Sequence, residues 1–151
     1  MLPGPPTPAR LPIRLLGLLL TVALALGGCD RLAQPPHRVL LQALGLQIAL
    51  TQQSIADALR LEAAGPPDVS RVRVEHQEGV TIGEQSGLRL SGRFDWRLSG
   101  DPFRVDSPFE LYLQRGDRGQ SWRLARPSGS SDGLSQDWLT YPLPLPNERP
   151  G

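Results

Sequence analysis

Cysteine, lysine and aromatic side chains are scarce or absent in this chain of 151 residues. Cys29 is the only cysteine, so no disulfide can form within one chain, and the fold has to rely on its core. All sixteen basic residues are arginine, which we attribute to GC-rich coding more than to function. Aromatic residues make up 5% of the chain, so Leu, Val and Ala must supply most of any core.

Residue types that serve catalysis or metal binding are also few. His37 and His76 are the two histidines, and neither has a second histidine, cysteine or carboxylate cluster that would complete a metal site. The sequence contains no glycine-rich loop for phosphate binding. We therefore expect no metal, no cofactor and no enzymatic activity.

One segment fits the formal pattern of a nucleophile elbow, Gly129-Ser130-Ser131-Asp132-Gly133. That motif requires a strand before the serine, a helix after it and a histidine later in the chain. Here the surroundings are a polar loop, and both histidines precede Ser131. We assign no catalytic role to Ser131.

A long apolar run does stand near the start of the chain. Arg10 and Arg14 are followed by leucine, valine and alanine up to residue 26, and then by two glycines and the single cysteine. A basic region, an apolar core of about 7–15 residues and a small-residue exit are typical of a secretory signal. We predict that residues 1–28 are a signal peptide.

The end of this run, Leu26-Gly27-Gly28-Cys29, resembles the lipobox of bacterial lipoproteins. The resemblance implies cleavage between Gly28 and Cys29 and attachment of a lipid to the Cys29 thiol. One myristoyl chain binds a membrane reversibly, whereas two or three acyl chains hold firmly, so the mature protein would be anchored to the cell membrane on its periplasmic face. Asp30 resembles the inner-membrane retention signal of enterobacterial lipoproteins, which slightly favours the inner over the outer membrane.

Two other interpretations of the N-terminus stay open. The apolar run could be an uncleaved transmembrane helix, although it is shorter than the roughly 20 residues that span a bilayer. It could also be an ordinary signal peptide beside an incidental cysteine. A Cys29→Ala variant separates these interpretations, because only a lipoprotein would be exported and then lose its membrane attachment.

The mature chain is close to electrically neutral. Two of the sixteen arginines and none of the fifteen acidic residues precede residue 29, which leaves fourteen positive charges against fifteen negative ones. A nucleic-acid-binding domain would need a basic stripe. We expect no nucleic-acid partner. The expected partner is the membrane, through the lipid anchor. An envelope protein is an open candidate, and any small-molecule ligand is unknown.

The mature chain divides into a lipidated tether at 29–36, an α+β domain at 37–127 and a flexible tail rich in Ser, Gly and Pro at 128–151. Apolar residues at spacings of four or seven predict a helix from about residue 38 to 64; they are Leu40, Leu44, Ile48, Ile55 and Leu59. Gly65 and the prolines after it are a helix stop signal. In the tail, Trp138, Leu139 and Tyr141 could return as an edge strand.

Alternation of apolar and polar residues predicts four strands, around 71–76, 88–98, 109–114 and 122–125. Turn residues at 116–119 predict a hairpin between the last two. We expect Gly92 on the apolar face, where its missing side chain would let the helix approach. The predicted fold is α+β, with one long N-terminal helix packed on a four-stranded antiparallel meander sheet.

This order of elements, with Trp122 following a glycine turn, resembles cystatin-like and nuclear-transport-factor-2-like domains. The resemblance implies a helix lying across a curved sheet. In members with enzymatic activity, a histidine and a carboxylate between helix and sheet can act as an acid–base pair. Here His76 keeps step with the inward Val72 and Val74, whereas Asp95 falls on the outward side, so we expect no such pair.

The outward side of the second strand carries Arg89, Arg93 and Arg97. These arginines are a candidate docking face for anionic lipid heads or an acidic protein. The other explanation is a row of cross-strand ion pairs with nearby carboxylates, and we favour it. The leading hypothesis is a non-catalytic binding or scaffolding domain at the envelope; the alternative is a small-molecule-binding or enzymatic domain with a pocket between helix and sheet.

Overall fold

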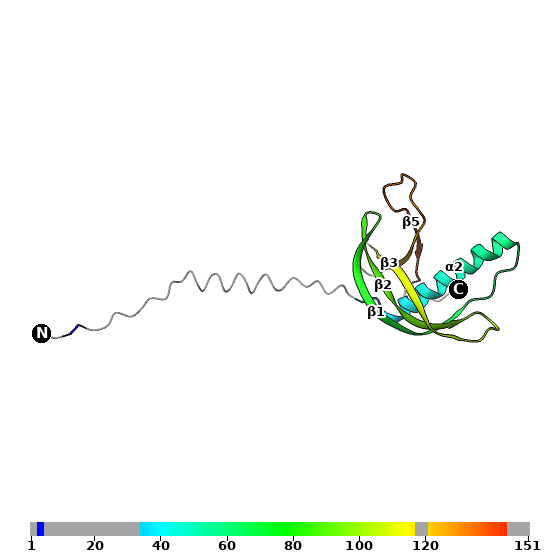
Figure 1. Ribbon diagram of the computed structural model, residues 1–151, viewed down its shortest axis with the longest axis horizontal. Coiled ribbons are helices and arrows are strands. Elements are labelled where there is room, and N and C mark those ends of the chain that lie inside the picture. Colours follow the sequence, from blue (N-terminus) through cyan, green and yellow to red (C-terminus); the bar gives the residue numbers. More distant parts are fainter. Residues whose placement is uncertain (1–2, 5–33, 117–120, 145–151) are drawn as a thin grey trace. The chain divides into compact units, whose positions relative to one another are not determined.

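In the part of the chain that the computed structural model describes, one helix crosses one face of a curved antiparallel sheet (Figure 1). The structure describes residues 3–4, 34–116 and 121–144. The predicted signal peptide and Cys29 lie outside the described residues, apart from Pro3 and Gly4. The α+β class, with a long helix on an antiparallel sheet, is confirmed.

The helix, α2 (His37–Leu59), ends earlier than the predicted boundary at about residue 64. Arg60 adopts the left-handed conformation with φ 55°, and its N–H bonds to the carbonyl of Asp57. The N–H of Leu61 reaches back to the carbonyl of Ala56 at 2.9 Å. These two bonds form a Schellman motif, which closes the helix before the Gly-Pro-Pro stop is reached.

The sheet has five strands, not the four that we predicted. Each strand is antiparallel to the next; they are β1 (Asp68–Ile82), β2 (Gln85–Arg97), β3 (Arg104–Arg115), β4 (Trp122–Pro127) and β5 (Trp138–Pro142). The predicted antiparallel pairing of β3 with β4 is confirmed, and the predicted turn between them lies outside the described residues from 117 to 120. The additional strand comes from the segment that we assigned to the tail, where Trp138 packs edge-on to Tyr112 at 5.0 Å. This burial of an aromatic ring stabilises β5 at the sheet edge.

Apolar side chains fill the space between α2 and the sheet. The first half of the helix contributes Leu40 and Leu44, and the sheet contributes leucines with no exposed surface; these are Leu90, Leu111, Leu113 and Leu124. The rings of Phe94 and Phe109 meet edge to face at 5.7 Å. By length and composition α2 could cross a membrane, but a core helix passes the same test, and α2 packs on the sheet here.

Register shifts interrupt the alternation at one end of the sheet. β1 shifts against β2 between Ser70 and Arg73, and again between Val74 and His76. Each shift places more residues on β1 than on β2, as in a β-bulge, so the side chains that follow change faces. Gly92 lies on the apolar face as expected, opposite Phe109. The expected neighbour was wrong: a Cβ there would lie 1.9 Å from the carbonyl oxygen of Arg73, so the close neighbour is the β1 backbone, not the helix.

Candidate functional site

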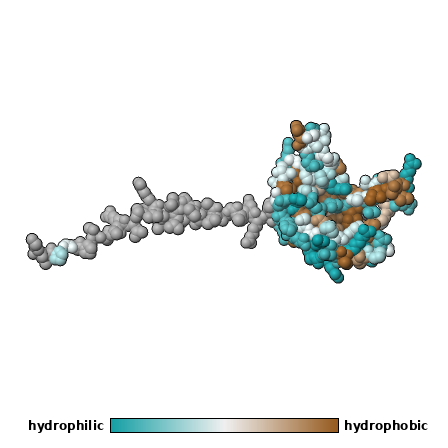
Figure 2. All heavy atoms as spheres, viewed as in Figure 1, coloured by the Kyte–Doolittle hydropathy of each residue, from teal (hydrophilic) through white to brown (hydrophobic). Residues whose placement is uncertain are grey.

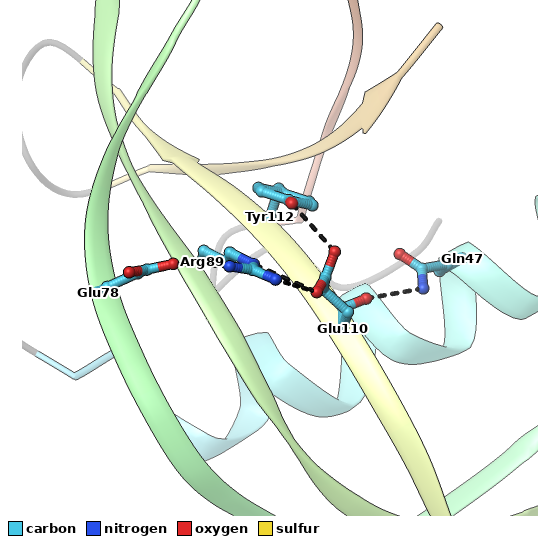
Figure 3. Close-up of polar contacts among 5 residues, drawn as sticks. All are labelled: Gln47, Glu78, Arg89, Glu110 and Tyr112. Atoms are coloured by element: carbon cyan, nitrogen blue, oxygen red, sulfur yellow. Dashed lines mark hydrogen bonds and ion pairs between the residues drawn. The ribbon is translucent and has the colours of Figure 1, made fainter.

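The sheet face turned away from α2, which we call the outer face, carries a set of ion-paired arginines. Arg89 lies between two carboxylates, with Nη1 2.9 Å from Glu78 and Nη2 2.6 Å from Glu110 (Figure 3). Tyr112 donates its hydroxyl to Glu110 at 3.0 Å, and Gln47 of α2 donates to the Glu110 carbonyl at 3.2 Å. These residues come from four different elements, α2, β1, β2 and β3, and the fold brings them together.

These hydrogen bonds and ion pairs shift the pKa values of Glu110 and Tyr112. The hydrogen bond from Arg89 lowers the pKa of Glu110, and the bond from Tyr112 adds to that effect. Partial burial and its bond to Glu110 raise the pKa of Tyr112. Glu110 is therefore held as an anion that forms an ion pair with Arg89. A carboxylate held in one ionic form is suited to a structural role more than to proton transfer.

The other arginines of the predicted docking face are engaged in the same way. Arg97 bonds to Asp68 at 2.8 Å, and Arg93 donates to the backbone carbonyl of Asp106 at 3.1 Å. Arg73 of β1 forms an ion pair with the carboxylate of Asp106. Arg73, Arg89, Arg93 and Arg97 each lie within ion-pair distance of a carboxylate, so the geometry at these four residues favours cross-strand ion pairs over a free cationic surface.

Asp95 lies on the outer face as predicted, but it is buried. Its side chain is 7% exposed, and its carboxylate accepts the backbone N–H of Asp106 at 2.8 Å. Arg71, which is itself largely exposed, lies 3.5 Å from the other carboxylate oxygen. Asp95 therefore stabilises the bulged end of the sheet and is not presented to a ligand.

His76 does not point between the helix and the sheet, so that expectation was wrong. The register shift after Val74 pairs His76 with Ser91, a residue of the outer face, and leaves the imidazole exposed. His76 borders a shallow hollow of about 370 Å³ that Glu78 and Arg89 also line. Asp95 lies four residues from Ser91 along β2, about 13 Å away at the usual rise of a strand. The structure therefore brings His76 and Asp95 to one face without bringing them together.

Ser131 lies in the exposed loop between β4 and β5, and no helix follows it as far as residue 144, where the described segment ends. Its backbone N–H donates to the carboxylate of Asp137 at 2.7 Å. Asp132 accepts four bonds from its neighbours, two of them from the backbone N–H groups of Leu134 and Ser135. The Gly-Ser-Ser-Asp-Gly pattern is explained by loop geometry, since Ser, Asp and Gly are typical of such turns.

Sequence reasoning missed that the second half of α2 extends past its apolar neighbours. The spacing predicted one continuous buried stripe, but Ile55 is 47% exposed, Leu59 62% and the following Leu61 64%. Figure 2 shows hydrophobic atoms along this protruding end of the helix. We call Ile55, Leu59 and Leu61 the apolar tip. Helix periodicity could not reveal this exposure, because whether a helix residue is covered depends on how far the sheet extends beneath it.

Chemical groups for catalysis are sparse in the described part of the chain. Within residues 34–116 and 121–144, no three His, Cys, Asp or Glu side chains gather as they would around a metal ion. Comparison with models of known families, with curated proteins and with solved structures gives no match.

Proposed function

We propose that this protein is a membrane-anchored lipoprotein whose α+β domain is a non-catalytic binding module held at the bilayer surface. In this proposal Cys29 carries the lipid, residues 30–36 are the tether, and the apolar tip of α2 contacts the bilayer that holds the anchor. The single observation that supports this contact is the exposure of Ile55 and Leu59 on α2 and of Leu61 directly after it, whereas apolar side chains in the first half of the helix are buried.

The tether limits how far the domain can move from its anchor. Eight residue steps separate Cys29 from His37, and a fully extended chain covers at most about 29 Å over that length. The helix that starts at His37 has 23 residues and is about 34 Å long. A domain on so short a tether has its helix within reach of the bilayer at all times.

The size of the apolar tip favours the bilayer over a protein partner. A stable protein complex buries about 800 Å² on each partner, which is more than three partly exposed side chains supply. A tethered domain needs only a weak contact, because the anchor keeps the local concentration of the bilayer high. Burying an Ile or Leu side chain fully contributes about 1.5–3 kcal/mol, which is enough to bias the orientation of a tethered domain.

The alternative of an enzymatic or ligand-binding pocket between helix and sheet has less support. Leu44 and Leu111 fill that space, and His76 lies on the other side of the sheet. We therefore do not propose a function for the helix–sheet interface beyond stability.

The contact can be tested with a spin label on the apolar tip. If Cys29 is lipidated, a Leu59→Cys variant has a single free thiol, to which a nitroxide can be attached in the protein as isolated with its membranes. We expect relaxation of this label by oxygen, which concentrates in lipid, to exceed relaxation by a water-soluble nickel chelate.

Asp57→Cys is the matched control, because two residues along a helix place the label about 200° away, on the opposite side. The label at this position should respond mainly to the nickel chelate. Equal responses at the two positions would contradict docking on the bilayer. Protection at Leu59 in native membranes but not in protein-free vesicles would point to a protein partner instead. Labelling of Cys29 itself would contradict lipidation, which is a separate failure.

A further inference from the structure

A polar hollow of about 420 Å³ lies where the β1–β2 hairpin meets the ends of β3, β4 and β5. Its volume falls within the roughly 300–1,000 Å³ of small-molecule sites. Hydrogen-bonding side chains line it; they are Gln85, Gln114, Ser121, Arg123 and Thr140, with Gly116 at the edge. A lining with so few apolar groups is suited to a hydroxylated ligand.

The chain builds one wall of this hollow by folding Ile82 over a glycine. Ile82 is fully buried, and a Cβ on Gly87 would come within 2.4 Å of its Cδ1. With Ile82 in this place, its carbonyl accepts Nε2 of Gln114 at 3.3 Å. Gln114 is only 9% exposed, so this bond fixes a buried amide at the wall of the hollow.

Arg123 lies opposite Gln114 in the β3–β4 register and is half-buried. Its Nε donates to the hydroxyl of Thr140 at 3.3 Å. The arginines of β1 and β2 all pair with carboxylates, but no carboxylate in the described ranges forms an ion pair with Arg123. A half-buried guanidinium that has no counter-charge among the described residues can bind an anion from solution through two parallel N–H bonds.

We propose that this hollow binds a small hydroxylated carboxylic acid of the uronic-acid class. The guanidinium of Arg123 takes the carboxylate, and the Gln114 amide with the Ser121 hydroxyl takes the ligand hydroxyls. Among the described lining residues, one cation stands beside neutral groups, and this matches the single charge of a carboxylate better than the nearly double charge of a phosphate. The inference goes beyond the proposed function and does not depend on lipidation.

Calorimetric titration of the intact protein with four probes tests the site. We expect saturable binding of D-glucuronate, and at least about tenfold weaker binding of D-glucose, acetate and inorganic phosphate, because each lacks one part of the recognised chemistry. The side-chain amide resonance of Gln114 should shift with D-glucuronate in the same concentration range.

Arg123→Gln should weaken D-glucuronate binding by about tenfold or more, to the level of D-glucose, since the charge-assisted bonds are lost. Arg123→Lys keeps the charge without the two-pronged contact and should fall between the two. Arg97→Gln removes an arginine of the outer face and should leave binding unchanged; the melting temperature of each variant confirms folding. Equal affinity for D-glucuronate and D-glucose, tighter binding of phosphate, or full binding by a folded Arg123→Gln variant would overturn the proposal.

Discussion

The carboxylate of Asp95 accepts the backbone N–H of Asp106 at 2.8 Å, and this bond joins β2 to the bulge of β3. Asp106 has φ 53°, and Arg71, which faces the same carboxylate from β1, has φ 48°. A positive φ is costly for residues other than glycine and persists where the surroundings fix it. Asp95 is placed to fix both neighbours.

Replacing Asp95 should therefore destabilise the domain. Asp95→Leu leaves the Asp106 N–H without its acceptor and should lower the free energy of unfolding by about 2–3 kcal/mol. Asp95→Asn keeps an acceptor oxygen and should cost less. Arg71→Gln serves as the control: its side chain is 76% exposed, so a change within about 0.5 kcal/mol is expected. Urea unfolding followed by tryptophan fluorescence measures all three, and equal losses for the Asp95 variants and Arg71→Gln would refute this role.

Two glycines should respond to alanine in opposite directions. A Cβ on Gly92 would overlap the carbonyl of Arg73, which is backbone and cannot rotate away, so Gly92→Ala should cost about 2–4 kcal/mol. A Cβ on Gly45 meets nothing within 4 Å, and alanine favours the helix, so Gly45→Ala should gain up to about 1 kcal/mol. Thermal unfolding of both variants checks the signs. A stable Gly92→Ala protein would show that β1 does not approach β2 as described.

The first half of α2 packs against the sheet and its C-terminal end is exposed, so alanine substitutions of two leucines should differ in their effect on stability. Leu44 is 1% exposed, and Leu44→Ala should cost about 2–5 kcal/mol through the cavity that it leaves. Leu59 is 62% exposed, and Leu59→Ala should change stability by no more than about 0.5 kcal/mol. Chemical denaturation of the two variants is the measurement. A large loss at Leu59 would mean that the tip is covered in the folded protein.

The loop between β4 and β5 should depend on pH through Asp132. Bonds from the backbone N–H groups of Ser135 and Leu134, followed by those from two serine hydroxyls, lower its pKa below the ordinary 3.8. A lowered pKa in the folded state means that the stabilisation is complete above the ordinary value and is lost as the pH falls toward the folded value. Wild type should exceed Asp132→Asn in loop protection at neutral pH and match it in strong acid. Hydrogen exchange of the Ser135 amide follows this, and a pH-independent difference would contradict it.

Much of the fold follows from local patterns. The four-and-seven spacing of Leu40, Leu44 and Ile48 predicted the helix, and strict alternation predicted the strands from β1 to β4. The turn residues at 116–119 predicted the β3–β4 hairpin. These features depend on residues that are close to one another along the chain, so they can be predicted from the local sequence.

The remaining features depend on contacts between distant segments. The Arg-Val-Arg-Val alternation of β1 gives no sign of the register shifts at Ser70 and Val74, and a shift of one residue moved His76 to the outer face. The exposure of Leu59 depends on where the sheet ends, and the position of Gln114 depends on Ile82 folding over Gly87. That the arginines of the outer face form ion pairs could be predicted from the sequence. Which carboxylate each arginine contacts depends on the strand register, which the sequence does not show.

The central claim of membrane anchoring is tested most directly by the mass of the mature N-terminal peptide, isolated from the membranes of cells that express the full chain. We predict a peptide that begins at Cys29 and carries a diacylglyceryl group on its thiol, and we predict that a Cys29→Ala variant appears in the soluble fraction. An unmodified Cys29 within a longer N-terminal peptide, or a Cys29→Ala variant that stays firmly in the membrane, would contradict the account.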